Sequence, residues 1–337
     1  MRKKLVNLAL QGGGSHGAFT WGVLDYFMED GRVSVEGISG TSAGAMNAVV
    51  LTHGYMNGGT EGAREALETF WKQVSAHALM SPIKRTPLDI LTGNWSLDAS
   101  PVYMMYDVLS RVVSPYEANP LNINPLKELI ESSVDFDKVR ACEAVKLFVA
   151  ATNVHSGKIK VFERSELTSD MVLASACLPT LYQAVEIEGV PYWDGGYVGN
   201  PPLYPLYDDA KSRDIIIVQI NPVTRQETPK TARDIHNRIN EISFNTSLLR
   251  ELRSIEFVHR LLEEKRLDTN QYADVLVHRI EGSDALSDLS PSSKVNAEWS
   301  FLTQLRDMGR AAAKTFIDKH YDDLGEHSTL NLREEFS

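Results

Sequence analysis

A Gly-x-Ser-x-Gly pentapeptide, Gly40 to Gly44, constrains the fold of this chain more than any other stretch. It follows a short apolar run at residues 35–39 and opens a segment rich in helix formers. Such a turn from strand to helix is so sharp that only glycine fits on either side of the serine. The hydroxyl of Ser42 would then be exposed at a helix N-terminus, where negative charge is favoured. The pattern predicts either a nucleophile elbow or a glycine turn without chemistry.

Strand-like and helical segments alternate around the pentapeptide. The expected strands cover residues 5–10 and 35–39, and the expected helices cover residues 18–30, 42–53 and 61–78. The order β-α-β-α is typical of a parallel sheet covered by helices. The sequence therefore predicts an α/β fold with a mainly parallel central sheet, and 337 residues are enough for a large core.

The second half of the chain continues this alternation. The expected strands are 144–154, with a hairpin partner at 158–163, then the hairpin 184–187/190–193, then 214–220 and 272–280. Helices are expected at 167–177, 231–264 and 294–319. The alternating arginines and glutamates of residues 231–264 are typical of a solvated, salt-bridged helix face, with a phospholipid headgroup or partner site as the alternative. Residues 321–337 are predicted to be a loose polar tail.

Residues 79–125 form a weakly patterned stretch that six prolines interrupt. One helical piece is expected there, at residues 102–113. Long irregular segments in compact domains are often functional covers. The apolar side chains of this stretch suit a lid or a lipid-facing rim, and ordinary packing of a loop onto the core is the alternative; they are Leu79, Met80, Ile83, Leu88, Ile90, Leu91, Trp95, Met104 and Met105.

The composition limits the partners and the compartment. A net charge of −11 argues against nucleic acid as the main partner and against charge-driven binding to anionic membranes. The two cysteines, Cys142 and Cys177, do not suggest a disulfide framework, so a reducing, cytoplasmic location is expected. Peripheral contact with membranes is a second expectation. The basic, apolar start of the chain is interpreted as a first buried strand and not as a signal peptide, and no apolar run is long enough to span a membrane.

The glycine-rich loop at residues 11–17 admits two functions. Gly12, Gly14 and Gly17 fit the dinucleotide fingerprint G-x-G-x-x-G, and Glu36 lies about twenty residues further on. Glu36, however, precedes the apolar core of its strand, whereas a ribose-binding acid should end it. Consecutive glycines can instead direct backbone N–H groups at a developing oxyanion. We therefore favour an oxyanion loop, with a dinucleotide-dependent oxidoreductase as the rival hypothesis.

A serine nucleophile needs a base. None of the nine histidines ends a strand in a glycine-marked loop. Asp194 does end a hairpin strand, and Gly195 and Gly196 after it allow its carboxylate to approach another loop closely. A partly desolvated carboxylate can take the proton itself. Taken alone, Asp194-Gly195 also reads as an ordinary turn.

Four separated blocks, taken together, resemble the patatin-like phospholipases in order and spacing. The blocks are residues 12–17 (GGGSHG), 40–44 (GTSAG), 174–179 (ASACLP) and 194–196 (DGG). The resemblance covers about residues 5–222 and leaves residues 223–320, a mostly helical extension packed on the same domain, outside it. It implies a three-layer α/β/α fold and a lipid acyl hydrolase with a Ser–Asp dyad.

The resemblance also implies roles for individual residues. Ser42 would be the nucleophile, Asp194 the general base, and the N–H groups of Gly13, Gly14 and Ser15 the oxyanion hole. Glycines that support the motifs are Gly12, Gly17, Gly40, Gly44, Gly195 and Gly196. The expected partner is a lipid or other acyl ester, and no cofactor or metal ion is needed.

One residue departs from the family pattern, and other functions remain open. His16 stands where the family often has arginine or lysine, so any charge it lends to the loop would depend on pH. The open alternatives are the oxidoreductase, an ordinary α/β-hydrolase triad with a late histidine, and a non-catalytic lipid-binding or regulatory protein.

Overall fold

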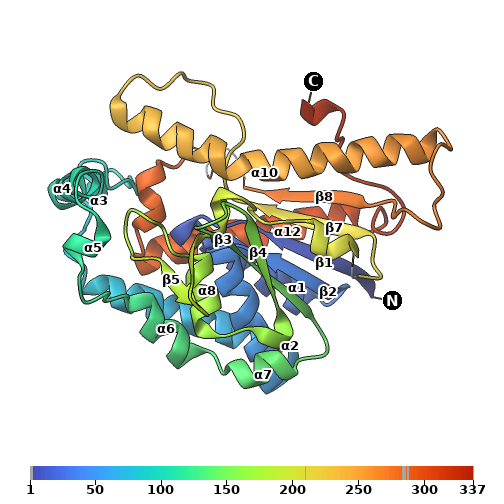
Figure 1. Ribbon diagram of the computed structural model, residues 1–337, viewed down its shortest axis with the longest axis horizontal. Helices are drawn as coiled ribbons and strands as arrows, with labels where there is room; N and C mark the ends of the chain where they lie inside the picture. Colours follow the sequence, from blue (N-terminus) through green and yellow to red (C-terminus); the bar gives the residue numbers. More distant parts are fainter. Residues whose placement is uncertain (1–2, 209, 283–285, 287, 337) are drawn as a thin grey trace.

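The computed structural model describes residues 3–208, 210–282, 286 and 288–336. Its centre is one eight-stranded sheet with the order β5-β6-β3-β2-β1-β7-β8, and β4 pairs with β3 (Figure 1). The parallel part consists of β1 (Lys4–Leu10), β2 (Val33–Gly40), β7 (Asp214–Gln219), β8 (Leu276–Glu281) and the first half of β3 (Lys146–Asn153). The expected α/β fold with a mainly parallel sheet is confirmed.

Two apolar clusters show that helices cover both faces of the sheet. Leu8, Leu10 and Ile216 belong to a cluster with α1 (Gly17–Asp30), α2 (Ala43–Leu79) and α12 (Trp299–His320). Ala9 and Ile217, which alternate with them along the strands, pack with α10 (Ala232–Glu263) on the other face. Because successive strand residues point to opposite faces, the structure has three layers, α/β/α.

The region between α2 and β3 differs from the expected irregular cover with one helix. It contains α3 (Pro87–Leu91), α4 (Pro101–Leu109), α5 (Pro115–Ala118), α6 (Pro125–Ser133) and α7 (Phe136–Ala141). Each of the first four begins with proline directly after a Thr, Ser or Asn residue. Proline suits the first helical position, because the N–H that it lacks would have no partner there. Four of the six prolines in this stretch therefore start helices and do not interrupt them.

Antiparallel strands complete the sheet on the β3 side. β4 (Ile159–Glu163) pairs with β3, and β5 (Val185–Ile187) pairs with β6 (Val190–Asp194). The turn between β5 and β6 has positive φ at both Glu188 and Gly189, which matches the twist of a two-residue hairpin. Both predicted hairpins are confirmed. α8 (Ser169–Ser175) lies between them in sequence, and α9 (Tyr204–Asp208) precedes β7.

Two other segments differ from expectation. α2 contains non-helical backbone at Gly58 and Gly59, so the two expected helices meet at a kink. The expected helix at 294–319 begins only at Trp299, after the 3-10 turn η4 (Pro291–Val295). The remaining short turns are η1 (Gly14–His16), η2 (Arg164–Glu166), η3 (Gly195–Tyr197) and η5 (Glu334–Phe336).

The C-terminal segment packs against the sheet, contrary to the expectation of a loose tail. Ser328 Oγ accepts the N–H of Val277 in β8 at 3.0 Å, and Leu332 is buried in the apolar cluster under α10. Arg279 of β8 also pairs with Glu335 at 2.6 Å. In the described part of the chain, no helix is both long and apolar enough to cross a membrane.

Candidate active site

Ser42 occupies a sharp turn between β2 and α2. Its backbone has φ 54° and ψ −121°, an uncommon conformation for a residue with a side chain. A Cβ at Gly40 would lie 2.8 Å from the amide nitrogen of Ala45, and one at Gly44 would overlap the carbonyl of Leu10. Backbone crowding therefore explains both glycines, and the strand–serine–helix turn that the pentapeptide predicted is present.

The sheet register brings the end of β6 to the end of β2. Along the same edge of β3, Val149 pairs with Gly40, the last residue of β2, and Ala151 pairs with Asp194, the last residue of β6. The two strands run in opposite directions and end two residues apart along β3. Asp194 and the Ser42 turn therefore meet, although about 150 residues separate them in sequence.

Asp194 is a buried carboxylate, with 2% of the residue exposed. One of its oxygens accepts the N–H of Gly196 at 2.7 Å. Burial raises the pKa of Asp194 to about 7, and hydrogen bonds from Gly196 N–H and from the Ser42 hydroxyl offset only part of this rise. A carboxylate with this pKa can hold or release a proton near neutral pH, as a general base must.

The glycine loop lies directly against Ser42. A Cβ at Gly12 would be 2.7 Å from the Ser42 Cβ, so only glycine allows this approach. Among the described residues, no acceptor receives the N–H groups of Gly13, Gly14 or Ser15. Gly12 packs against the serine, and the three N–H groups that follow it have no partner among the described residues, which is the condition for holding an anion.

Three polar residues whose role the sequence did not predict form hydrogen bonds with the backbone of Ser42 and Gly12. Ser175 Oγ accepts the Ser42 N–H at 2.8 Å, and Asn200 Oδ1 accepts the Gly12 N–H at 2.7 Å. Asn221 Nδ2 donates to the Gly12 carbonyl at 2.6 Å. Ser175 belongs to the block of residues 174–179 (ASACLP). The two asparagines had no signal in the sequence, because their role depends on loops that meet only in the fold.

His16 does not support the glycine loop by charge. The imidazole is buried, with 3% of the residue exposed, and its Nε2 lies 2.7 Å from Ser293 Oγ. Burial, with further contributions from Lys294 and Arg225, holds the pKa of His16 well below its usual value. His16 is therefore neutral at physiological pH, and it supports the loop by packing and by one hydrogen bond.

Helix α10 contributes to the site from outside the four sequence blocks. A Cβ at Gly196 would overlap the ring of Phe244 on α10, and the Tyr197 and Phe244 ring centroids are 5.2 Å apart. On the same helix Glu241 is 4% exposed and pairs with Arg225 and Arg238. Glu241 is therefore buried between two partly exposed arginines, so this part of the helix face is less solvated than expected.

Because the Phe244 ring sits where a Gly196 side chain would be, we expect Gly196→Ala to displace the Asp194 loop. The variant should be less stable, because an overpacked contact costs about 1–3 kcal/mol of folding free energy. Any activity that depends on the Asp194 carboxylate should fall by about tenfold or more, because a small misplacement of a reacting group is costly. Adding Phe244→Ala should restore part of the loss by making room. Thermal unfolding and kcat/KM of the two single variants and the double variant measure this coupling, and additive effects would contradict it.

The structure disfavours both the dinucleotide site and a histidine base. The Glu36 carboxylate accepts the N–H groups of Lys211 and Ser212, which precede β7. Glu36 therefore lies toward the amino ends of the parallel strands, whereas the glycine loop follows the carboxyl end of β1. Among the described residues, no histidine is hydrogen-bonded to Ser42 or Asp194. His278, in β8, instead contacts Asp214 and Thr329 at 3.0 Å.

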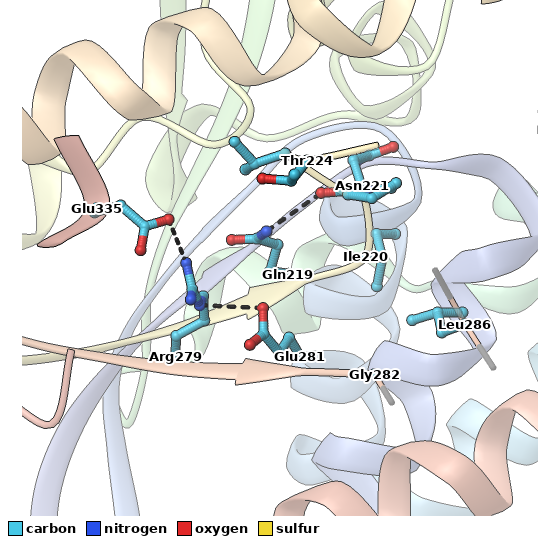
Figure 2. Close-up of a pocket in the computed structure, with 11 residues that line it drawn as sticks. Gln219, Ile220, Asn221, Thr224, Arg279, Glu281, Gly282, Leu286 and Glu335 are labelled. Atoms are coloured by element: carbon cyan, nitrogen blue, oxygen red, sulfur yellow. Dashed lines mark hydrogen bonds and ion pairs between the residues drawn. The ribbon is translucent and has the colours of Figure 1, made fainter. Parts of the chain in front are cut away.

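A cavity of about 180 Å³ lies next to the glycine loop, at the carboxyl ends of β7 and β8 (Figure 2). Ile220, Asn221 and Gly282 form one side of it, and Arg279 lies between Glu281 and Glu335 on the other. Asn221 is shared with the loop support, but neither Ser42 nor Asp194 lines the cavity.

Comparison with known proteins agrees with this architecture. The layered sheet and the strand–serine–helix turn define an α/β protein with a sharp turn of the Gly-x-Ser-x-Gly type. A family profile described as patatin-like phospholipase matches residues 8–207, more than half of the chain. The chain belongs to the patatin-like phospholipase family, a family of lipid acyl hydrolases.

The solved structures that match this chain include two bacterial proteins. VipD from Legionella pneumophila has 14% identity and a TM-score of 0.42, over 95% of this chain and 67% of VipD. ExoU, in complex with SpcU from the type III secretion system of Pseudomonas aeruginosa, has 14% identity and a TM-score of 0.40, over 95% and 52%. The chain thus spans about two thirds of one neighbour and half of the other. A search of curated protein sequences returns no match.

Proposed function

We propose that this protein is a serine acyl hydrolase that cleaves carboxylic ester bonds of lipids through an acyl-Ser42 intermediate. The observation that carries the proposal is the pairing of a strained serine turn with a buried carboxylate whose pKa is about 7. Membership of the patatin-like phospholipase family supports the same class of substrate.

In the acylation step the ionised Asp194 takes the proton of the Ser42 hydroxyl as Oγ attacks the ester carbonyl carbon. The carbonyl oxygen becomes an oxyanion and accepts hydrogen bonds from the N–H groups of Gly13, Gly14 and Ser15. One such donor typically lowers the barrier by about 3 kcal/mol. Asp194 then gives its proton to the leaving alcohol or lysolipid, and the acyl group stays on Ser42.

In the deacylation step a water molecule replaces the alcohol. Asp194 takes one of its protons, and the resulting hydroxide attacks the acyl carbon. The second tetrahedral intermediate forms on the same loop. When it collapses, the fatty acid leaves, and Asp194 returns the proton to Ser42 Oγ, so that the free enzyme is restored.

An acyl-ester panel of graded chain length and head group tests the function directly. We expect release of fatty acid from ester lipids, and labelling of Ser42 alone by a fluorophosphonate. Absence of turnover and of labelling would favour a lipid-binding or regulatory protein. Stabilisation of the protein against heat by a nicotinamide dinucleotide would instead support the oxidoreductase hypothesis.

We further propose that residues 79–125 form a lipid-facing cover for this site. α4 is apolar or aromatic at every position except Asp107, yet none of its residues is buried. The exposed apolar residues around it include Leu91 and Met105, at 84% and 61% exposure. A helix that is apolar on all sides needs an apolar medium on all sides, and a lipid layer supplies one.

Contacts connect this cover to the catalytic turn. Arg233 of α10 pairs with Asp98 just before α4, and the N-terminal half of α10 extends over the same end of the molecule as α3 to α5 (Figure 1). Burial raises the pKa of Tyr106 of α4 to about 12, with a smaller contribution from Tyr182. Tyr182 in turn neighbours Cys177, whose carbonyl accepts the Asp194 N–H at 2.8 Å. A lipid held at α4 would therefore lie near the serine.

The double variant Met105→Asp/Leu109→Asp should weaken binding to phosphatidylcholine vesicles by about tenfold or more, because burying each apolar side chain contributes about 1.5–3 kcal/mol. Hydrolysis of a soluble short-chain ester should stay within about twofold, since hydrocarbon burial affects only lipid binding. Phe257→Asp, an equally exposed apolar site on the far half of α10, is the matched control. Equal loss of vesicle binding in control and variant would contradict the assignment. Vesicle sedimentation and ester kinetics provide the two measurements.

A further inference from the structure

A partly buried lysine from outside the matched family region reaches Asn221, which supports the glycine loop. Lys294, in η4, donates from Nζ to Asn221 Oδ1 at 2.7 Å. Its backbone carbonyl lies where a Cβ at Gly14 would be, so η4 packs directly on the loop. The catalytic steps derived above assign no role to this cation.

The orientation of the Asn221 amide follows from its partners. The ammonium of Lys294 can only donate, so it must face Oδ1, and the carbonyl of Gly12 can only accept, so it must face Nδ2. Nδ2 also donates to Gln11 Oε1 at 3.2 Å. Asn221 therefore passes a hydrogen bond from a positive charge on one side to the loop backbone on the other.

The chain of polarised bonds ends at a donor beside Ser42. The carbonyl of Gly12 and the N–H of Gly13 belong to one resonance-coupled peptide group. A strong donor at the carbonyl oxygen withdraws electrons from the peptide and makes its N–H more acidic, and such chains strengthen cooperatively in a low-dielectric interior. That N–H has no partner among the described residues.

We propose that Lys294 is a positioning residue whose ammonium polarises, through Asn221 and the Gly12–Gly13 peptide, the N–H that receives the developing oxyanion. The inference rests on the proposed serine hydrolysis. Under this inference, a residue in the C-terminal part of the chain affects the rate of acylation through the glycine loop.

The surroundings of Lys294 make this effect dependent on pH. Burial lowers the pKa of Lys294 to about 8, with Arg225 adding to the decrease and Glu241 opposing it. Arg238 faces the same Glu241 carboxylate, and His16, on the loop side, is neutral. As pH rises through about 8 the ammonium loses its proton, the hydrogen bond to Asn221 weakens, and kcat should fall.

Nuclear magnetic resonance of the full-length wild-type protein tests the polarisation without any turnover. We expect the Gly12 carbonyl ¹³C and Gly13 ¹⁵N resonances to titrate together with a midpoint near pH 8, and Lys294→Met to abolish this titration. Resonances that stay constant from pH 6.5 to 9.5 in wild-type protein would overturn the inference, whether or not the lysine variant folds.

Kinetics of the same variants give the second readout. Lys294→Met should lower kcat roughly tenfold near pH 7 at unchanged KM. The variant lacks the charged donor to Asn221, so the Gly13 N–H stabilises the oxyanion of the transition state less strongly. Lys294→Arg should recover most of the rate and show no fall near pH 8, since arginine stays charged. The control Lys314→Met, at an exposed lysine of α12, should match wild type.

The outcomes separate the two proposals. A wild-type protein that hydrolyses no ester refutes the serine hydrolase, and the resonance titration can still be measured. An active wild type whose alkaline fall persists in Lys294→Met refutes the role of Lys294 alone. If Lys294→Met and Lys294→Arg both lower kcat and raise KM, the contribution of Lys294 is purely structural. That result would also refute the polarising role of Lys294.

Discussion

Ser42→Ala should reduce ester hydrolysis by at least about 10⁴-fold while the fold is retained, because no other group on the elbow can form the acyl-enzyme. The substitution removes only one oxygen, and alanine keeps the contact between its Cβ and Gly12. The N–H of residue 42 still donates to Ser175. Thermal unfolding should therefore change little, in contrast to the activity.

Fluorophosphonate labelling and mass spectrometry check this result at the level of the residue. Wild-type protein should carry one adduct on Ser42, and Ser42→Ala should carry none. The matched control is Ser175→Ala, which removes the acceptor of the Ser42 N–H but leaves the nucleophile. It should be labelled, at a reduced rate. Substantial hydrolysis by Ser42→Ala would exclude the acyl-serine mechanism.

Asp194→Asn should also abolish turnover, because an amide cannot take the serine proton. The amide oxygen can still accept the Gly196 N–H, so the loop should keep its conformation. In wild-type protein, kcat/KM should rise with pH through about 7 as Asp194 ionises. A full rate in Asp194→Asn would reopen the search for a histidine base.

The same substitution should stabilise the protein at alkaline pH. The pKa of Asp194 rises from 3.8 to about 7 on folding, so between these values the folded state holds a proton that the unfolded chain has released. Stability therefore falls as pH rises from about 4 to 7, and the buried charge remains unfavourable above 7. Asparagine has no charge to bury, so above pH 7 the variant should be more stable by an amount on the order of a few kcal/mol.

Urea unfolding at pH 5 and pH 8 measures this effect. We expect the difference between Asp194→Asn and wild type to be larger at pH 8 than at pH 5. A variant that is inactive and less stable by the same amount at both pH values would show that Asp194 is a structural acceptor for Gly196 and not a titrating base.

Several elements were predictable because their causes are local. The alternation of short apolar runs with helical segments predicted the parallel sheet, and Glu188-Gly189 predicted the β5–β6 hairpin. The expectation of an irregular stretch at residues 79–125 was wrong at four of its six prolines, because proline can interrupt a helix or start one. The preceding Thr, Ser or Asn decides between these outcomes, and that pairing was present in the sequence.

By itself the sequence determined where a nucleophile elbow can form. Gly40 and Gly44 permit the sharp turn around Ser42. The crowding at Gly40 comes from its near neighbours Gly44 and Ala45 and is encoded in that stretch, whereas the crowding at Gly44 comes from the Leu10 carbonyl of the adjacent strand. The glycine loop and the Asp-Gly-Gly turn are encoded in the same local way. Their assignment as one site came from their order and spacing.

Only the tertiary structure decided the pKa values, charge states and hydrogen-bond partners of these residues. Burial sets the raised pKa of Asp194 and the neutrality of His16, and burial depends on every element packed around a group. Asn221 and Lys294 reach the glycine loop from more than 200 residues away. Hydrogen bonds and desolvation act through space, so a sequence without its fold does not specify which distant residues exert them.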